Sequence, residues 1–359
     1  MHLGLITTSW PSAQRPWAGH FIRDLALALV DEGARVTVLT PEWSGHGPLE
    51  ADPRLEMIVA PLPGAPGSLA GDWTSGLRAL WALRSAAKAL QPDLWLCNWW
   101  PTRFAVAGSE SCLAVLHGSD VDLLARLPSM VRRWIGHQLS CVAVAEGVAK
   151  RYARLTGQSR PPVCPMGARS STGEVDKLPE PARRWSMSQR YRVLTAGRGS
   201  DSKGWRAVEG AQELMPDVDW LQVKPEHGIG PEGIRRLIAL ADLVVVPSEG
   251  GQGRPSEGRP HVIAQALVSG VPVVGGPNLA VREAMALFGQ QEVEAEGSER
   301  LAEGVLRALK PDRHGVLKDR AREAGQALEW SSLGPRWAQI VRAAQTQPGH
   351  RRTTATPSC

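Results

Sequence analysis

Three polar segments, each directly after an apolar run, hold residue types that could bind a ligand. In the first, AGRGSDSKG at 196–204, a predicted strand runs into a glycine-containing turn with Arg198 and Lys203 close by. Free backbone amides at a helix N-terminus and two cationic side chains stabilise an anion, so the ligand that we expect here is a diphosphate. Judged locally, a solvated turn would account for the same residues.

The second segment is a glycine-rich loop followed by a predicted helix, PSEGGQGRPSEGRPHVIAQALVSGVPVV at 247–274. Glu257 opens the helix that follows Pro260, and Gln265 lies eight residues further on, about two helical turns away. Both side chains can therefore face one ligand, and such a pair suits the vicinal hydroxyls of a sugar and of a ribose. The alternative is a capping carboxylate followed by a polar helix face.

The third segment, LHGSDVD at 116–122, places His117 at the carboxyl end of a predicted strand. A neutral imidazole there can hydrogen-bond a substrate oxygen or a developing charge, although a lone histidine is also a common structural residue. Asp120 and Asp122 are expected to cap the next helix, predicted over 123–139. Arginines among leucines in that helix leave open a peripheral contact with an anionic membrane, against the alternative of an ordinary surface helix.

Short apolar runs that alternate with helical patterns must position these segments. The pattern is typical of buried parallel strands in two doubly wound α/β domains, which bind ligands at the carboxyl ends of their strands. A helix is expected over 20–33. The expected strands are 3–8, 35–40, 55–60, 93–97, 112–117 and 141–145 in the first half, and 191–197, 220–223, 243–248 and 271–276 in the second.

The domain organisation follows from where this pattern stops and resumes. We predict an N-terminal domain over 1–168, a linker over 169–190 and a C-terminal domain over 191–329. A helix at about 330–345 could pack back on the N-terminal domain, and the polar tail 346–359 is expected to be disordered.

A further motif, GIGPEG at 228–233, matches the GxGxxG pattern of dinucleotide-binding loops. Pro231 lies inside it, and only nine residues separate it from the next strand, which leaves cramped space for a crossover helix. We therefore do not favour a nicotinamide cofactor.

Composition limits the classes of partner. The chain has 359 residues and a net charge of +5, but no basic run is interleaved with aromatic residues, so nucleic acid is not expected. Five scattered cysteines form no CxxC pair and no carboxylate cluster resembles a magnesium site, so neither a metal nor a cofactor is expected. Without an export signal or a spanning segment, the expected location is cytoplasmic, peripheral at the inner face of the membrane if the helix 123–139 binds it.

The three segments, in this order on a double α/β chain, resemble the family 4 retaining glycosyltransferases of GT-B fold, in which two Rossmann-like domains face each other across a cleft. GRGSDSKG is similar to the Gly-Arg…Lys-Gly phosphate site of that family, and the segment around EGRPHVIAQ is similar to its signature. The loop before the first helix, with Gly19, looks like the glycine-containing donor loop of the family.

The resemblance implies transfer of a sugar from a nucleotide-sugar donor, a UDP-sugar by default, to an unidentified hydroxyl acceptor that is lipid-linked, a polysaccharide or a small molecule. Arg198 and Lys203 would hold the diphosphate, and His117 would touch the sugar from the other domain. Glu257 and the residues that follow it would hold the sugar; these are Gly258, Arg259, Pro260 and His261.

Two features depart from the family pattern. The second signature carboxylate is Gln265, which can accept from a ribose hydroxyl but carries no charge, and the chain between 223 and 243 is shorter than the resemblance leads us to expect. These departures keep open an alternative from another class, a catalytically weak or inactive partner protein that binds a nucleotide sugar. An epimerase of nucleotide sugars is a further alternative.

Overall fold

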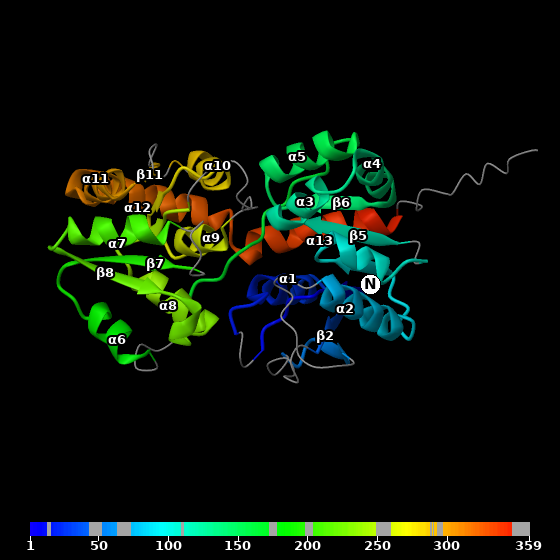
Figure 1. Ribbon diagram of the computed structural model, residues 1–359. Coiled ribbons are helices and arrows are strands. Elements are labelled where there is room, and N and C mark those ends of the chain that lie inside the picture. The colour runs from blue at the N-terminus through cyan, green and yellow to red at the C-terminus, as the bar shows by residue number, and fades with distance from the viewer. Residues whose placement is uncertain are drawn as a thin grey trace, which may run out of the picture.

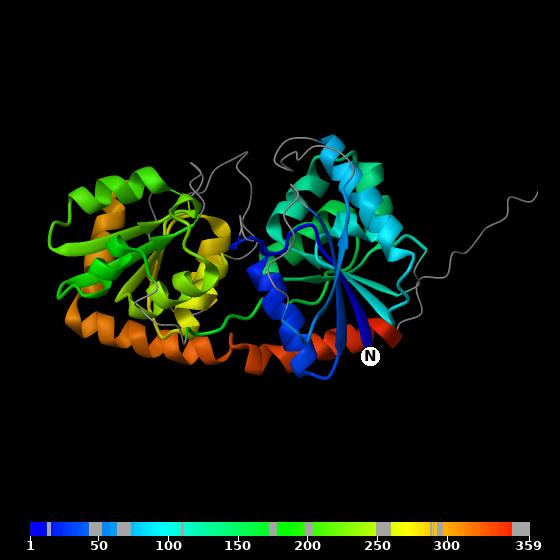
Figure 2. The ribbon, with the colours of Figure 1, turned by 90° about the horizontal axis from the view of Figure 1, so that it is seen from below.

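The computed structural model describes residues 1–12, 16–42, 52–62, 73–108, 111–171, 178–197, 204–248, 260–287, 289, 291–292 and 297–346. Within these ranges the chain forms two parallel sheets, one in each half of the sequence. The two halves lie side by side, and helices cover the faces of both sheets (Figures 1 and 2). The prediction of two doubly wound parallel sheets is confirmed.

The first sheet has six parallel strands in the order β3-β2-β1-β4-β5-β6. They are β1 (His2–Ile6), β2 (Arg35–Pro41), β3 (Glu56–Ala60), β4 (Leu94–Cys97), β5 (Cys112–Leu116) and β6 (Ser140–Ala143). Each coincides with a predicted apolar run, because a parallel sheet covered on both faces buries nearly every side chain. The strand order reverses between β1 and β4, and sheets of this kind bind ligands outside the carboxyl ends of the strands at that point.

The helices of the first half include one departure from the sequence prediction. They are α1 (His20–Asp31), α2 (Trp73–Ala87), the 3-10 helix η1 (Trp100–Phe104), α3 (Gly118–Ala125), α4 (Ser129–Gln138) and α5 (Glu146–Thr156). The single helix predicted over 123–139 is wrong, since α3 ends at Ala125 and α4 begins after Pro128. The proline has no backbone N–H to continue α3, and it disfavours helical backbone at the residue before it.

The capping roles predicted for Asp120 and Asp122 are also wrong. His117 is the N-cap residue of α3, with extended backbone and no side-chain cap. Asp120 lies in the first turn and its Oδ1 accepts from the N–H of Val121 at 2.9 Å, while Asp122 pairs with Arg151. The helix begins earlier than expected, so both carboxylates lie inside it.

The second sheet has five strands in the order β11-β10-β9-β7-β8, all parallel. They are β7 (Tyr191–Ala196), β8 (Val218–Val223), β9 (Leu243–Val246), β10 (Val273–Gly275) and β11 (Gln291–Glu292). The helical elements are α7 (Trp205–Glu213), η4 (Pro225–His227), α8 (Pro231–Leu240), α9 (His261–Val268), α10 (Leu279–Leu287), α11 (Ser298–Leu309) and α12 (Pro311–Gln326).

The space before β9 accommodates a full crossover helix, contrary to the prediction that it is cramped. Helix α8 spans 10 residues and begins at Pro231, directly inside the GxGxxG match. Proline is favoured in the first turn of a helix, so the residue that seemed to interrupt the motif starts the helix instead.

Two further helices, α6 and α13, complete the fold. Within the range assigned to the linker, α6 (Glu180–Ser186) lies against β8, where the indole of Trp185 donates to the carbonyl of Asp219 at 2.9 Å. Helix α13 (Trp330–Thr346) packs against α1, β4 and β5, and its Trp337 is fully buried. Figure 2 shows α12 and α13 as an orange-to-red line of helices along one side of both halves. The tail after Thr346 lies outside the described residues.

The cysteines that the structure describes form no disulfide with one another. None of the helices in the described part of the chain has the length and apolar character that crossing a bilayer requires.

Candidate functional site

After β1, residues 7–12 form a loop that contacts Gly19, the N-cap of α1. Gly19 has a φ of 66°, and a Cβ placed on it would lie 2.3 Å from the carbonyl oxygen of Ser9. The loop is held from within, since the hydroxyl of Thr7 donates to that same carbonyl at 3.0 Å. Only glycine combines this backbone with this approach. The loop therefore fixes the N-terminus of α1 outside the carboxyl end of β1.

His117 lies at the carboxyl end of β5 and points toward β4. Its Nε2 is 3.2 Å from Oδ1 of Asn98, the residue after β4. Because that oxygen is an acceptor, Nε2 carries the proton and Nδ1 retains a lone pair. Burial lowers the pKa of His117 to about 4, and the edge of the Phe21 ring lies beside it at 5.5 Å between centroids. The imidazole is therefore neutral near pH 7 and can accept a hydrogen bond from a ligand hydroxyl.

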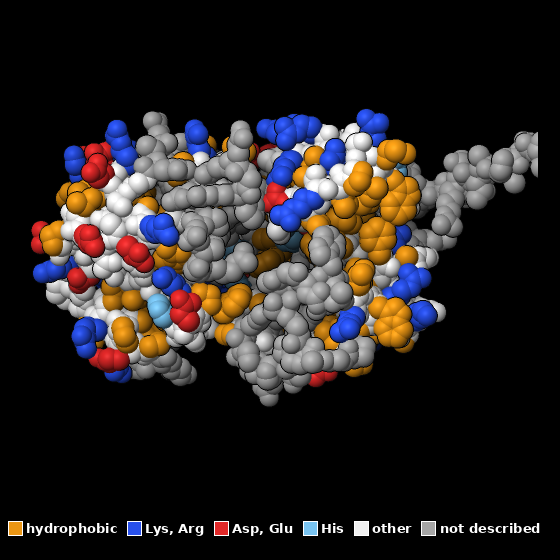
Figure 3. All heavy atoms as spheres, in the orientation of Figure 1, with side chains coloured by type: hydrophobic (Ala, Val, Ile, Leu, Met, Phe, Trp, Pro, Cys, Tyr) orange, Lys and Arg blue, Asp and Glu red, His pale blue; other side chains and the backbone are white. Residues whose placement is uncertain are grey.

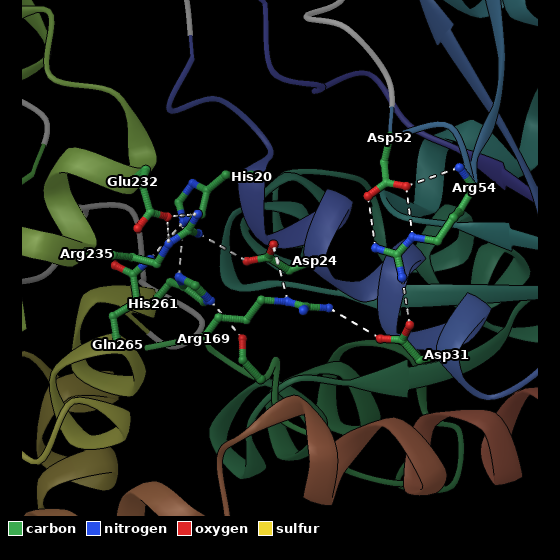
Figure 4. Close-up of polar contacts among 11 residues, drawn as sticks. His20, Asp24, Asp31, Asp52, Arg54, Arg169, Glu232, Arg235, His261 and Gln265 are labelled. Carbon is green, nitrogen blue, oxygen red and sulfur yellow. Dashed lines mark hydrogen bonds and ion pairs between the residues drawn. The ribbon is translucent and has the colours of Figure 1, made fainter. Parts of the chain in front are cut away.

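The two halves meet where the first residues of α1 and α9 touch (Figure 4). Nε2 of His20, in α1, lies 3.2 Å from Nδ1 of His261, in α9. The remaining nitrogens face carbonyl oxygens: Nδ1 of His20 that of Trp17 at 2.9 Å, and Nε2 of His261 that of Gly167 at 2.9 Å. Carbonyls only accept, so both of these nitrogens carry the proton in neutral rings.

It follows that the two facing nitrogens both present lone pairs when the rings are neutral. The amide nitrogen of Gln265, which is 4% exposed, lies 3.4 Å from Nε2 of His20 and can donate to it. Burial lowers the pKa of His20, and burial together with the charge of His20 lowers that of His261 to about 3. Near pH 7 the facing nitrogens of His20 and His261 are therefore both acceptors, and one added proton would bridge the rings.

A buried ion pair lies one turn along α1 from His20. Asp24 is 6% exposed, and its carboxylate lies 3.6 Å from the guanidinium of Arg235 in α8 and 4.0 Å from that of Arg169. Arg235 also pairs with Glu232 at 2.8 Å, and Arg169 with Asp31 at 3.5 Å. The Oδ2 atom of Asp24 has no hydrogen-bond partner. Asp24 therefore attracts Arg235 of the other half through charge alone, without a hydrogen bond.

A second cross-half contact lies at the start of α5. The carboxylate of Glu283, in α10, accepts from the backbone N–H of Gly147 at 3.1 Å. Helix α5 has no side-chain cap of its own, so a carboxylate from the other half satisfies one of its free N–H groups and complements its dipole.

Several predicted site residues lie outside the described residues: Arg198, Lys203, Glu257, Gly258 and Arg259. The described residues that flank them come together at the carboxyl edge of the second sheet. A Cβ on Gly204, the N-cap of α7, would lie 2.2 Å from the carbonyl oxygen of Pro247 after β9, and one on Gly276 would lie 2.7 Å from that of Ser248. Pro260 is the N-cap of α9.

Among the predicted residues, Gly19, His261 and Gln265 are brought into one region, with His117 joined to it through Phe21. The Phe21 ring lies 5.5 Å from that of His117 and 5.8 Å from that of His261. Figure 3 shows a hollow between the two halves. The described residues contain no group of three or more His, Cys, Asp or Glu side chains placed to hold a metal ion.

Sequence reasoning missed His20, Asp24, Asn98, Arg169 and Arg235. Two of them carried a signal, since His20 directly follows Gly19 and Asn98 follows a predicted strand. The arginines and Asp24 carried none, because their partners are distant in the sequence.

Comparisons with known proteins support the resemblance drawn from the sequence. Residues 18–168 match the family model described as Glycosyltransferase Family 4. None of the curated proteins matches the chain. Among solved structures, the sucrose-phosphate synthase of Thermosynechococcus elongatus is similar at 18% identity and a TM-score of 0.72, covering 96% of this chain and 98% of that one.

Two further structures cover the chain almost fully. WaaG, a glycosyltransferase involved in lipopolysaccharide biosynthesis, is 16% identical with a TM-score of 0.65, covering 94% of this chain and 99% of that one. HepE of Anabaena, solved in complex with UDP and glucose, is 15% identical with a TM-score of 0.65, covering 96% of this chain and 100% of that one. The predicted resemblance to family 4 glycosyltransferases and the predicted GT-B fold are confirmed.

Proposed function

We propose that this GT-B chain, whose first half matches the family 4 model, is a retaining glycosyltransferase that uses a nucleoside-diphosphate sugar. The observation that carries the proposal is the contact between His20 and His261, which brings the N-termini of α1 and α9 together at the carboxyl ends of two Rossmann-like sheets. Helix N-termini favour anions, and a donor diphosphate supplies one. A similar protein, HepE of Anabaena, was solved with UDP and glucose, so UDP is the nucleotide that we propose first.

The donor would be held mainly by the second half. Arg198 and Lys203 follow β7 in the sequence and would neutralise the diphosphate, whereas Glu257 and the residues from Gly258 to His261 would bind the sugar. Gln265 and His20 offer a donor and acceptors to a ribose hydroxyl from one side of the cleft. Gly19 sets the start of α1 against which the donor would close.

The acceptor hydroxyl would attack the anomeric carbon from the face that the nucleotide leaves, so that the configuration is retained. Negative charge grows on the departing diphosphate, and cations and helix N-termini already in place would stabilise it. The neutral imidazole of His117 would accept a hydrogen bond from the sugar, which keeps the transferring group oriented without adding charge. With side-chain cations in this role, we propose a reaction that needs neither a metal nor a cofactor, in the cytoplasm.

A second candidate is a partner protein that binds the nucleotide sugar but turns it over weakly. The observation that favours it is the position of Gln265: its amide is neutral, almost fully buried and directed at His20. A ribose would have to share or displace that contact.

The test is binding followed by turnover. The purified chain is titrated with UDP, GDP and ADP and their glucose conjugates by calorimetry, with Lys203→Ala and Glu257→Ala beside it. We expect one nucleotide to bind, Lys203→Ala to weaken it, and Glu257→Ala to reduce donor hydrolysis or transfer more than nucleotide affinity. Binding without any release of sugar, across lipid, polysaccharide and small-molecule acceptors, favours the partner protein. No binding of any nucleotide contradicts both. The anomeric configuration of a product, measured by NMR, tests retention.

A further inference from the structure

A second surface of the molecule, on the first half, exposes large apolar side chains. Leu77 and Trp81 of α2 are 65% and 67% exposed, and Met130 and Trp134 of α4 are 82% and 55% exposed. Single exposed apolar residues are ordinary, but a contiguous group marks an interaction site. We call these four residues, together with Phe104 of η1, the α2–α4 face.

The α2–α4 face is continuous, because η1 joins its two helices. The rings of Phe104 and Trp134 stack at 6.1 Å between centroids, with 9° between their planes. From the other side, the guanidinium of Arg84 in α2 donates to the carbonyl of Phe104 at 3.1 Å. Leu77, Trp81 and Arg84 follow one another at helical spacing and so lie along one stripe of α2. In Figure 3, apolar side chains and blue cations lie together over this part of the first half.

The charged residues within the elements of the α2–α4 face all have one sign. Exposed cations lie on its helices and in the adjoining segments: Arg78, Arg84, Lys88, Arg126 and Arg133. No aspartate or glutamate occurs in 73–87, 100–104 or 123–139. Exposed apolar residues of the second half differ in this respect, since Leu279 and Leu306 share their helices with Glu283 and Glu303.

This combination selects one occupant. Amphipathic helices with aromatic residues on the apolar face and Lys or Arg beside it bind at the interface of anionic bilayers, and each cation near such a surface adds attraction. A second copy of this chain would place cations against cations across a two-fold interface. We propose that the α2–α4 face docks the protein on the surface of an anionic lipid bilayer. The α2–α4 face does not include His20, His261 or Gln265, and this proposal does not rest on the proposed reaction.

The structure also refines which residues should be tested. The predicted contact over 123–139 is divided by Pro128 into α3, which packs in the first half, and α4, which carries the exposed side chains. Arg132 donates to the carbonyls of Ala125 and Leu127, so it holds the turn between the helices rather than facing a bilayer. Arg78 and Arg133 are exposed and are the charges to reverse.

The experiment is co-sedimentation of the full chain with vesicles of phosphatidylcholine alone and of phosphatidylcholine with phosphatidylglycerol at a ratio of about three to one. We expect binding to the anionic vesicles only, weakening as salt is raised. The variant Trp81→Ser/Trp134→Ser and the variant Arg78→Glu/Arg133→Glu should each partition at least about tenfold less.

The matched control reverses one charge and removes one exposed apolar residue of the second half, in the variant Arg206→Glu/Leu279→Ser, and should partition as the unchanged protein does. Circular dichroism and melting curves verify that every variant folds. Equal binding to neutral vesicles, equal loss in the control, or no binding at low salt would overturn the proposal. So would dimerisation through the α2–α4 face, detected as a mass change that Trp81→Ser/Trp134→Ser abolishes.

Discussion

The helices α1 and α7 begin in the same way in the two halves of the molecule. Each follows the first strand of its half and starts at a left-handed glycine, Gly19 with a φ of 66° and Gly204 with a φ of 68°. A Cβ on Gly19 would meet the carbonyl oxygen of Ser9 at 2.3 Å, and one on Gly204 that of Pro247 at 2.2 Å. One local device therefore sets both helix N-termini at the carboxyl edge of a sheet.

The residue after the glycine differs between the halves. In α7 it is Trp205, which is 6% exposed in its own half, with the ammonium of Lys224 5.0 Å from its ring centroid. In α1 it is His20, which contacts His261 and Gln265 of the other half. The start of α7 thus packs within one half alone, whereas the start of α1 contacts the other half. We call the contacts of His20 and Asp24 with His261, Gln265 and Arg235 the joint between the halves. Mutations at the two places should separate folding of a half from closure of the cleft.

The largest effect is expected at the glycines themselves. Gly19→Ala and Gly204→Ala would each add a left-handed alanine and force a Cβ into a backbone carbonyl, at a cost of about 3 kcal/mol. The free energy of unfolding, measured with urea, should fall in both. Only Gly19→Ala should also change the distance between the halves, measured by small-angle X-ray scattering.

Gly33→Ala is the matched control for both glycines. Gly33 has a φ of 84°, but no atom lies within 4 Å of the place that a Cβ would take, so only the cost of the left-handed backbone applies, about 1 kcal/mol. If Gly19→Ala is no more destabilising than Gly33→Ala, the close approach to Ser9 does not constrain the loop.

A smaller loss is expected from Asp24→Asn, which removes the charge that α1 offers to Arg235 and Arg169. Arg235 keeps Glu232 as a partner and Arg169 keeps Asp31. Because of these remaining pairs, and because the contacts with Asp24 are 3.6 and 4.0 Å long, we expect a loss of about 2 kcal/mol, below the usual cost of breaking a buried ion pair. Urea unfolding measures it, and scattering should show more separated halves. Asp319→Asn, in an exposed pair with Arg322, should change neither quantity. Equal effects of the two variants would mean that Asp24 does not hold the joint.

Acid should destabilise the protein through its buried histidines. An unfolded histidine titrates near pH 6.5, whereas folding lowers the pKa of His117 to about 4 and that of His261 to about 3. Their stabilising contribution is therefore complete above pH 6.5 and is lost as the pH falls toward the folded values, because the unfolded chain takes up protons first. Between pH 7 and pH 5 each should cost about 1–2 kcal/mol, seen as a lower melting temperature.

Protonation of Asp120 changes the stability in the opposite direction. The quantity to measure is therefore the difference in melting temperature between a variant and the unchanged protein. Burial raises its pKa to about 8, and its contribution to stability therefore falls as the pH rises. His261→Gln keeps Asp120 and should flatten the loss of melting temperature between pH 7 and pH 5. The exposed His137→Gln is the control. Identical pH profiles for His261→Gln and the unchanged protein would show that His261 does not resist protonation.

The strands could be predicted from the sequence and the contacts between the halves could not, because only the strands leave a local pattern. Burial on both faces makes each parallel strand an apolar run in the sequence, and β11 escaped prediction because it has only two residues. The break between α3 and α4 was readable from Pro128 in principle. The contact between His20 and His261 joins residues 241 positions apart and leaves no local pattern. The roles of Arg198, Lys203 and Glu257 stay predictions.

The smallest effect is expected from Gln265→Glu, which restores the carboxylate of the family signature at the joint. A carboxylate 3.4 Å from Nε2 of His20 would favour the proton that bridges His20 and His261, and so raise the pKa of that pair. A folded pKa closer to the unfolded value leaves a smaller difference in proton uptake, so this variant should lose less stability between pH 7 and pH 5, by about 1 kcal/mol at most.

Gln212→Glu, on the exposed face of α7, is the control, because a carboxylate there has no histidine of the joint beside it. A pH profile equal to that of the control would mean that no proton bridges the rings. A smaller loss would show that the neutral Gln265 keeps His20 and His261 unprotonated near pH 7. The left-handed glycine is common to the starts of α1 and α7, so this difference between them comes from the residues that follow it.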